Sequence, residues 1–157
     1  MIHLSAGRGR AARPRKRGGA MIEFAICFGV LFPVFIGGFQ FGYTFYLYNE
    51  METAVRGGAR YASMRTYDSP TSTPSSGFST AVRNMVVYGA PAGGTSPLVP
   101  GLSRENVQLT VVFDLGMPRE VRVSIVNFDL DAVVATLRIH DKPKATFPYL
   151  GRYAGTS

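Results

Sequence analysis

Residues 17–24 read Arg-Gly-Gly-Ala-Met-Ile-Glu-Phe, and they join a basic N-terminal segment to a long apolar stretch. After Glu23 the next charged residue is Glu50, so residues 24–49 carry no formal charge. A helix of about 26 residues is ~39 Å long, enough to cross a hydrocarbon core of ~30 Å. An acidic side chain inside such a helix is costly unless it has a partner, so Glu23 requires a functional explanation.

The net charge of +7 over 157 residues is concentrated at the N-terminus. No acidic residue precedes Gly18, whereas the rest of the chain is almost balanced in charge. A basic flank beside an apolar helix is typical of a segment held on the cytoplasmic side of a membrane, and not of a nucleic-acid-binding surface. The leader's cationic residues are Arg8, Arg10, Arg13, Arg15, Lys16 and Arg17.

The apolar stretch is expected to remain in the protein as a membrane anchor. A secretory signal peptide has an apolar core of only about 7–15 residues, and no short small-x-small site follows such a core here. We therefore expect a single-pass protein with a cytoplasmic N-terminus and everything after Asn49 on the far side. Cys27 is the only cysteine, which excludes an intrachain disulfide and favours a small apolar role within the helix.

Three regions follow from composition and periodicity. Residues 1–18 form a basic leader without apolar periodicity, which we expect to be disordered in water. Residues 19–65 form one helix, first membrane-spanning and then amphipathic, and residues 66–157 form an extracytoplasmic α+β domain. Gly57-Gly58 is expected to bend the helix or to let another backbone approach closely. The amphipathic half is marked by apolar residues at steps of three and four: Met51, Ala54, Val55, Ala59 and Ala62.

The outer region combines helical and strand signals. Alternation of apolar and polar residues predicts strands at 107–115 and 121–128, with turn residues at 116–119 between them. Spacing of three and four predicts a short helix around residues 78–86. The expected fold class is therefore α+β: a long N-terminal transmembrane helix continues into an amphipathic half, which packs on a small antiparallel sheet.

The remaining outer segments are expected to be loops and short elements. Segments rich in Pro, Gly, Ser and Thr predict loops at 67–77 and 90–101. Residues 145–153 are aromatic and interrupted by Pro, which fits an edge strand or an extended tail. A short helical turn capped by Asp129 or Asp131 is predicted from the spacing of Leu130, Val133, Val134 and Leu137.

The junction at 17–24 resembles class III prepilins of type IV filament systems, in which a basic leader ends in Gly and an acid stands fifth after it. Arg17 to Ala25 resembles more closely the start of TadE-like pseudopilins of tight-adherence (Flp) pili. Pro33 after Leu31-Phe32 fits the same pattern, and so do residues 37–42 and 57–62. The resemblance covers residues 17–65, and the fold it implies is pilin-like.

This resemblance implies a minor pseudopilin that is cut between Gly18 and Gly19 by a prepilin peptidase of the aspartic type. Glu23 would become the fifth residue and pair with a free amino terminus, with Phe24 beside it in the assembly face. Pro33 would kink the helix. The protein would assist assembly or priming of a Flp pilus through helix–helix packing, as a hetero-oligomer with other pilins or pseudopilins and the assembly platform. It would lie in the bacterial inner membrane, with its outer domain in the periplasm or the pilus.

Two other functions remain open on the residues alone. The first is an uncleaved bitopic envelope protein with a small partner-binding domain, and the second is a pseudopilin of a secretion or DNA-uptake system. No enzyme activity, cofactor, metal site or nucleic-acid partner is expected. His3 and His140 lie far apart in the sequence, and no nucleophile or phosphate-loop motif is present. Four acids read as turn or capping residues, not as a calcium site: Asp114, Asp129, Asp131 and Asp141.

Overall fold

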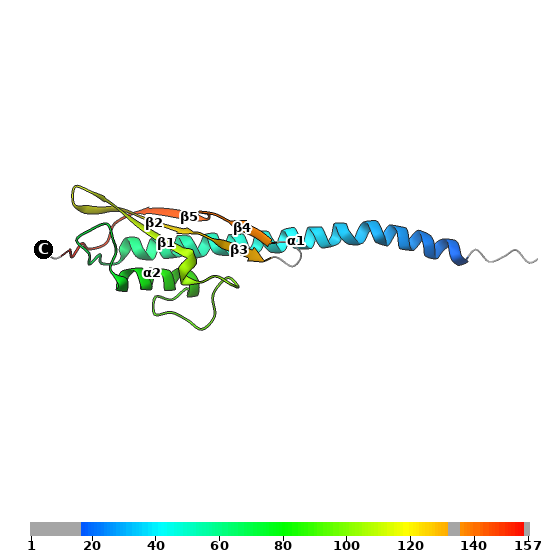
Figure 1. Ribbon diagram of the computed structural model, residues 1–157, viewed down its shortest axis with the longest axis horizontal. Helices are drawn as coiled ribbons and strands as arrows, with labels where there is room; N and C mark the ends of the chain where they lie inside the picture. The colour runs from blue at the N-terminus through cyan, green and yellow to red at the C-terminus, as the bar shows by residue number, and fades with distance from the viewer. Residues whose placement is uncertain (1–16, 132–135, 156–157) are drawn as a thin grey trace, which may run out of the picture. The chain divides into compact units, whose positions relative to one another are not determined.

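The structure is a computed structural model that describes residues 17–131 and 136–155. It is an α+β protein with a long N-terminal apolar helix, a second helix and a small antiparallel sheet, as the sequence predicts (Figure 1). The chain divides into two compact units, Met1–Gly38 and Phe39–Ser157. The first helix, α1, runs without a break from Arg17 to Met64 and contributes to both units.

The first unit contains the apolar part of α1. Its side chains from Gly18 onward are almost all exposed, and the helix continues through Pro33. A proline here removes one backbone donor, and a membrane helix tolerates that loss when neighbouring groups satisfy the freed carbonyl. Residues 1–16 of the predicted leader lie outside the described residues, so their expected disorder stays a prediction. The last two leader residues, Arg17 and Gly18, lie in α1.

The second unit is built around the amphipathic half of α1. One face of the helix is buried in the domain core, and the predicted periodicity is confirmed there. On the exposed side, Glu52 and Arg56 form an intrahelical ion pair four residues apart, with 2.5 Å between Oε1 and Nη2. The core-facing residues of α1 are Leu47, Met51, Ala54, Val55, Ala59 and Ala62.

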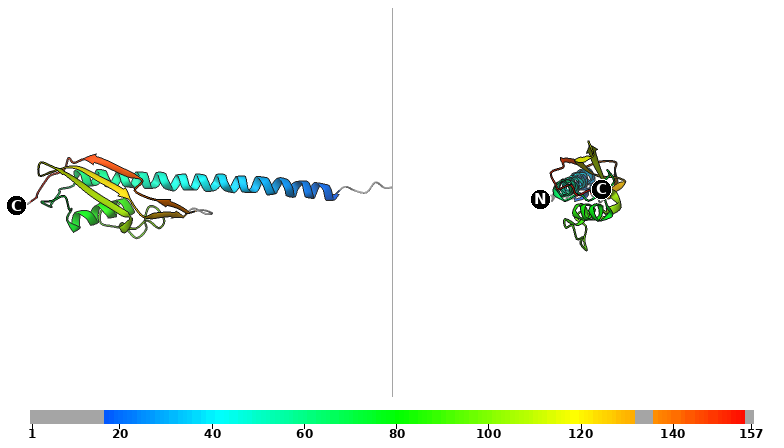
Figure 2. Two further views of the ribbon diagram at one scale, coloured as in Figure 1. Left: turned by 45° about the horizontal axis from the view of Figure 1, so that its top comes forward. Right: turned by 90° about the vertical axis from the view of Figure 1, so that its left-hand side faces the viewer.

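The second helix, α2 (Ser76–Tyr88), begins and ends at well-defined caps. The Oγ atom of Ser75 accepts a hydrogen bond from the Phe78 N–H at 3.1 Å, and Gly89 adopts a left-handed conformation (φ 72°) after the last turn. α2 runs beside the second half of α1 (Figure 2), where a Cβ on Gly58 would overlap the side chain of Val86. Gly58 thus permits close packing of the two helices. This agrees with the prediction that the glycine pair lets another backbone approach closely.

The main sheet has three antiparallel strands in the order β1-β2-β5. They are β1 (Val107–Asp114), β2 (Met117–Ile125) and β5 (Lys144–Pro148), and a 3-10 turn, η1 (Arg104–Asn106), precedes β1. Val107 pairs with Ile125 and Val121 with Phe147, so apolar side chains from successive strands share the inner face. The hairpin turn is shorter than predicted, because β2 begins at Met117.

The predicted helical turn over residues 130–137 is wrong. Residues Phe128–Asp131 (β3) and Thr136–Ile139 (β4) form an antiparallel pair, and the connection between them lies outside the described residues. Asn127 has a positive φ of 50°, which turns the chain out of β2 into β3, and Phe128 and Leu130 then alternate into the core. Asp129 consequently caps no helix and pairs with Arg138, with Oδ1 3.2 Å from Nε.

The segment after α1, predicted as part of a loop, contributes a central core residue. Tyr67 is fully buried and forms a bridge with Tyr153 in the C-terminal tail. Its N–H donates to Arg152 O at 2.9 Å, and Ala154 N–H donates to Tyr67 O at 2.9 Å. Residues 145–153 were predicted to form an edge strand or an extended tail, and the structure contains both. The first part belongs to β5 at the sheet edge, and the rest extends beside the end of α1.

Candidate functional site

Gly18 and Gly19 lie in the first turn of α1, where each is exposed. No atom lies within 4 Å of a Cβ built on either glycine, so nothing in the described chain requires glycine at these positions. The first four N–H groups of a helix have no partner within that helix, and glycine has almost the lowest helix propensity. This turn is therefore the part of α1 that unwinds at the lowest cost.

Glu23 stands four residues after Gly19, one turn further along the helix, and its side chain is exposed. Its neighbour Phe24 begins a row of phenyl rings along one side of α1. Phe24 and Phe28 stack with their centroids 6.0 Å apart, and Phe28 and Phe32 with theirs 5.0 Å apart. The site thus places one carboxylate beside a continuous aromatic ridge.

The apolar surface of α1 is too large to face water. Phe24 is 68% exposed, and large apolar side chains continue along the helix as far as Phe45 and Tyr46. Contiguous apolar patches of this kind mark a membrane or protein contact. By length and composition α1 is a helix able to cross a membrane. Cys27 lies exposed on the same stretch.

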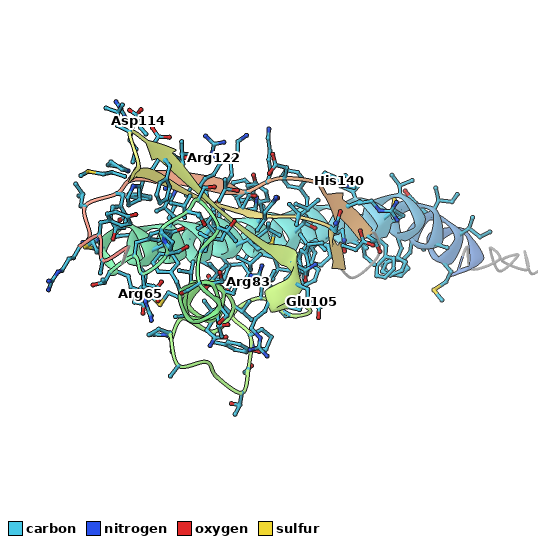
Figure 3. The ribbon with its side chains drawn as sticks, turned by 60° about the vertical axis from the view of Figure 1, so that its left-hand side comes forward. Arg65, Arg83, Glu105, Asp114, Arg122 and His140 are labelled. Atoms are coloured by element: carbon cyan, nitrogen blue, oxygen red, sulfur yellow. The ribbon has the colours of Figure 1, made fainter. Side chains whose placement is uncertain are left out.

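The polar residues considered as a metal or catalytic site are scattered over the second unit. Asp114 pairs with Arg119 in the β1–β2 hairpin, and Asp141 pairs with Lys144 at 3.8 Å. Figure 3 shows Asp114 at the hairpin end and His140 at the opposite end of the sheet. No group of three or more His, Cys, Asp or Glu able to hold a metal exists among the residues described. His3 lies outside them.

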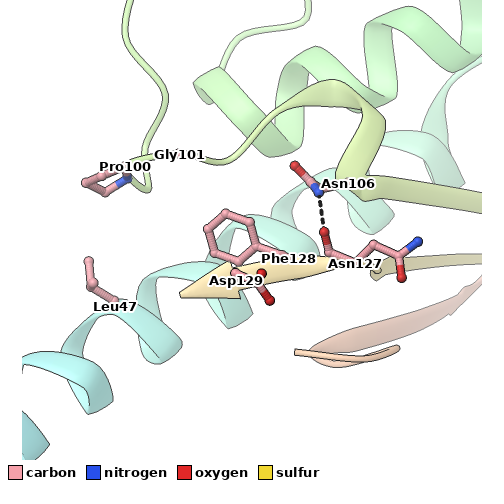
Figure 4. A pocket seen from close by; sticks show the side chains of 7 residues that line it. All are labelled: Leu47, Pro100, Gly101, Asn106, Asn127, Phe128 and Asp129. Carbon is pink, nitrogen blue, oxygen red and sulfur yellow. Dashed lines mark hydrogen bonds between the residues drawn. The ribbon is translucent and has the colours of Figure 1, made fainter. Parts of the chain in front are cut away.

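A pocket of about 440 Å³ opens between α1, the loop before β1 and strand β3 (Figure 4). Leu47 and Phe128 form its apolar side, and Asn106 donates from Nδ2 to Asn127 O at 2.8 Å on its polar side. Asp129, the acid in its lining, is already paired with Arg138. Among the residues described, the pocket lining therefore holds no paired acid and base of the kind that hydrolytic chemistry needs.

A polar network in the second unit joins the end of α1 to the C-terminal tail. Tyr67 N–H donates to the Tyr149 hydroxyl at 2.9 Å, and that hydroxyl lies 2.8 Å from both Arg65 O and Arg152 O. Burial raises the pKa of the Tyr67 and Tyr149 phenols above the ordinary value. Gly151 is necessary here, because a Cβ on it would collide with Arg65 O.

This network was missed from the sequence. The aromatic density of the tail was visible, but nothing in the local pattern linked residues 149–154 with Tyr67, about eighty residues earlier. Its role is structural, because it closes the domain around the last turn of α1. The cleavage candidates Gly18 and Gly19 and the assembly candidates Glu23 and Phe24 all lie in the first unit, exposed on α1.

Comparison with known families identifies the N-terminal segment. The family model of TadE-like proteins matches residues 18–60. The match begins at Gly18 and ends inside the amphipathic half of α1, which confirms the resemblance over those residues and connects the chain with the tight-adherence pilus system. No curated protein and no solved structure matches the chain.

Proposed function

We propose that this chain, which carries a TadE-like segment at residues 18–60, is a minor pseudopilin of a tight-adherence (Flp) pilus. It is processed by a prepilin peptidase and assists assembly or priming of the pilus. Residues 1–18 are the cytoplasmic leader, residues 19–65 the membrane-spanning and amphipathic helix, and residues 66–157 the periplasmic domain. Its partners are other pilins or pseudopilins and the assembly platform, and it has no enzymatic role.

The observation that carries the proposal is the position of Gly18 and Gly19 in the first turn of α1. An intramembrane protease must draw its substrate into an extended form, and this turn has few internal hydrogen bonds to lose. Cleavage there removes every cation of the leader and creates a new amino terminus at Gly19. The apolar helix then begins with a single positive charge.

Glu23 is the natural partner of that new charge. Residues four apart lie on the same side of a helix, so the Gly19 amine and the Glu23 carboxylate of one copy are within pairing reach. A carboxylate near the N-terminus also interacts favourably with the helix dipole. In an assembly, the amine of one subunit and Glu23 of a neighbour satisfy each other, while the row Phe24, Phe28 and Phe32 packs between helices.

The mature N-terminus tests this function directly. Mass spectrometry of the protein from its native membrane should find a chain that starts at Gly19. Gly18→Arg should block processing, whereas Gly9→Arg adds the same side chain within the leader and should leave processing intact. An intact leader on protein from cells with normal pili would instead establish the uncleaved bitopic envelope protein.

A further inference from the structure

Gly57 occupies a position in α1 that nothing within the described chain explains. Unlike Gly58, whose missing side chain makes room for Val86, Gly57 has no atom within 4 Å of a Cβ built on it. A glycine in a helix interior is less favourable than alanine, because it loses more backbone freedom on folding. Gly57 therefore lowers the stability of α1, and no close packing contact among the described residues requires a glycine there.

Gly57 lines a groove between α1 and the edge strand β5. The groove has a volume of about 500 Å³ and is lined by Thr53, Arg56, Gly57, Arg60 and Phe147. Phe147 offers a half-buried phenyl ring, and Arg56 is engaged with Glu52. Arg60 forms no ion pair with any residue that the structure describes. The groove therefore suits an apolar side chain accompanied by a carboxylate.

A matching projection lies on the same domain, at the turn of the β1–β2 hairpin. Leu115 is 97% exposed and Met117 is 64% exposed, beside the carboxylate of Asp114. Leu115 also has a positive φ of 51°, a conformation that favours Gly, Asn or Asp. A leucine at this position is unfavourable both for the backbone and for solvation, because the described part of the chain leaves it 97% exposed.

We propose that the hairpin tip of one copy docks in the Gly57 groove of a second copy. Leu115 occupies the space above Gly57 against Phe147. The Asp114 carboxylate pairs with Arg119 through Oδ2 and is half-exposed, and its other oxygen faces the guanidinium of Arg60. Gly57 is unfavourable inside a helix, and Leu115 is unfavourable at an exposed position with a positive φ. The contact gives both residues a role, and such local exceptions are expected at functional positions. Because the two surfaces differ, the contact is heterologous, and repetition leads to a chain of subunits.

The contact is too small to hold two soluble copies together, since stable interfaces bury about 1,200–2,000 Å². Copies anchored in one membrane, however, meet at a high effective concentration, which favours weak contacts. This inference concerns the outer domain and does not depend on cleavage at Gly18. It can therefore fail while the proposed function stands, and the reverse is also true.

Cysteine crosslinking in membranes tests the contact on the full chain. In a Cys27→Ser background, one tagged copy carries Thr53→Cys at the groove, and a differently tagged copy carries Met117→Cys beside the tip. Both changes leave Gly57 and Leu115 in place. A short thiol crosslinker should give a product with both tags, and Thr80→Cys on the exposed side of α2, in place of Met117→Cys, should give only background.

Two further changes identify the residues responsible. Gly57→Leu fills the groove and Leu115→Asn removes the projection, and each should lower the yield of product about tenfold, the equivalent of ~1.4 kcal/mol. Both variants should fold, because Gly57 faces open space and Asn suits a positive φ. Absence of the doubly tagged product, or a product that neither change diminishes, would overturn the proposal.

Discussion

Gly58 of α1 lies directly against Val86 of α2, in space that one additional carbon atom would fill. Gly58→Ala should therefore destabilise the second unit by about 1–3 kcal/mol, because overpacking forces side chains and backbone apart. Thermal unfolding of the full chain in detergent, followed by near-ultraviolet circular dichroism of its tyrosines, measures this loss.

The neighbouring glycine supplies the control for this substitution. Gly57→Ala faces open space and should stabilise the same unit by about 0.5–1 kcal/mol through helix propensity. If the two substitutions have the same effect, the close approach of α1 and α2 at Gly58 is not what limits the packing.

Tyr149→Phe tests the closure of the tail. The change keeps the ring but removes the hydroxyl that accepts from Tyr67 N–H and lies within hydrogen-bond distance of Arg65 O. Loss of these partners should cost about 1–3 kcal/mol of unfolding free energy, because the groups are partly buried. Tyr46→Phe, on an exposed ring, should be neutral in the same measurement. An equal loss in both variants would contradict the role given to the Tyr149 hydroxyl.

The phenol groups of Tyr67 and Tyr149 predict that the folded protein loses stability in alkali. Burial raises the pKa of Tyr67 and Tyr149 in the folded state, so the folded protein holds these two protons more tightly than the unfolded chain. Their contribution is fully present below the unfolded value of about 10 and is lost as pH rises through the folded pKa. Unfolding free energy should fall above pH ~10, and less steeply in the Tyr67→Phe, Tyr149→Phe double variant.

The cap of α2 provides a further measurable contribution. Ser75→Ala removes the oxygen that accepts from Phe78 N–H and the hydroxyl that donates to Asp68 at 2.7 Å. A loss of about 1 kcal/mol is expected, and Ser75→Thr should restore most of it. Ser76→Ala changes an exposed serine next to the cap and should have little effect in urea titrations. A Ser75→Ala variant as stable as the parent would show that another group satisfies this helix end.

Glu23→Gln tests the pairing proposed at the helix start. The neutral amide keeps the size of the side chain but cannot pair with the Gly19 amine, so membrane insertion should be normal while pilus number falls. Membrane fractionation and electron microscopy measure the two outcomes. Glu50→Gln changes the acid at the other end of the uncharged stretch and should preserve pili. Normal piliation in Glu23→Gln would exclude the pairing role.

Elements with a clear local period were predictable from the sequence. The core face of α1 and the first hairpin followed from steps of three and four and from strict alternation. Residues 128–139 were misread because Leu130 and Leu137 fit a helical spacing, whereas the fold determines that this segment pairs as a second hairpin. A positive φ at Asn127 cannot be read from a single sequence.

Some residues of the candidate site could likewise be predicted from the sequence, and others could not. The candidates at Gly18, Gly19 and Glu23 depend on local order and charge, which a sequence displays directly. Tyr67 and the Gly57 groove depend on neighbours that are distant in the chain: Tyr149 and Tyr153 for the first, and Phe147 for the second. Such neighbours become visible only when the packing is known.

The hydrogen bonds between Tyr67 and residues 152–154 carry a consequence for biosynthesis. Residues 152–154 are synthesised long after Tyr67, so the hydrogen bonds that close the domain cannot form until these later residues have left the ribosome. Leu150 N–H, which donates to Ser63 O at 2.9 Å, adds to this delay. Under the proposed topology the nascent chain stays open while it crosses the bilayer, and the domain locks onto the end of its own anchor only after export.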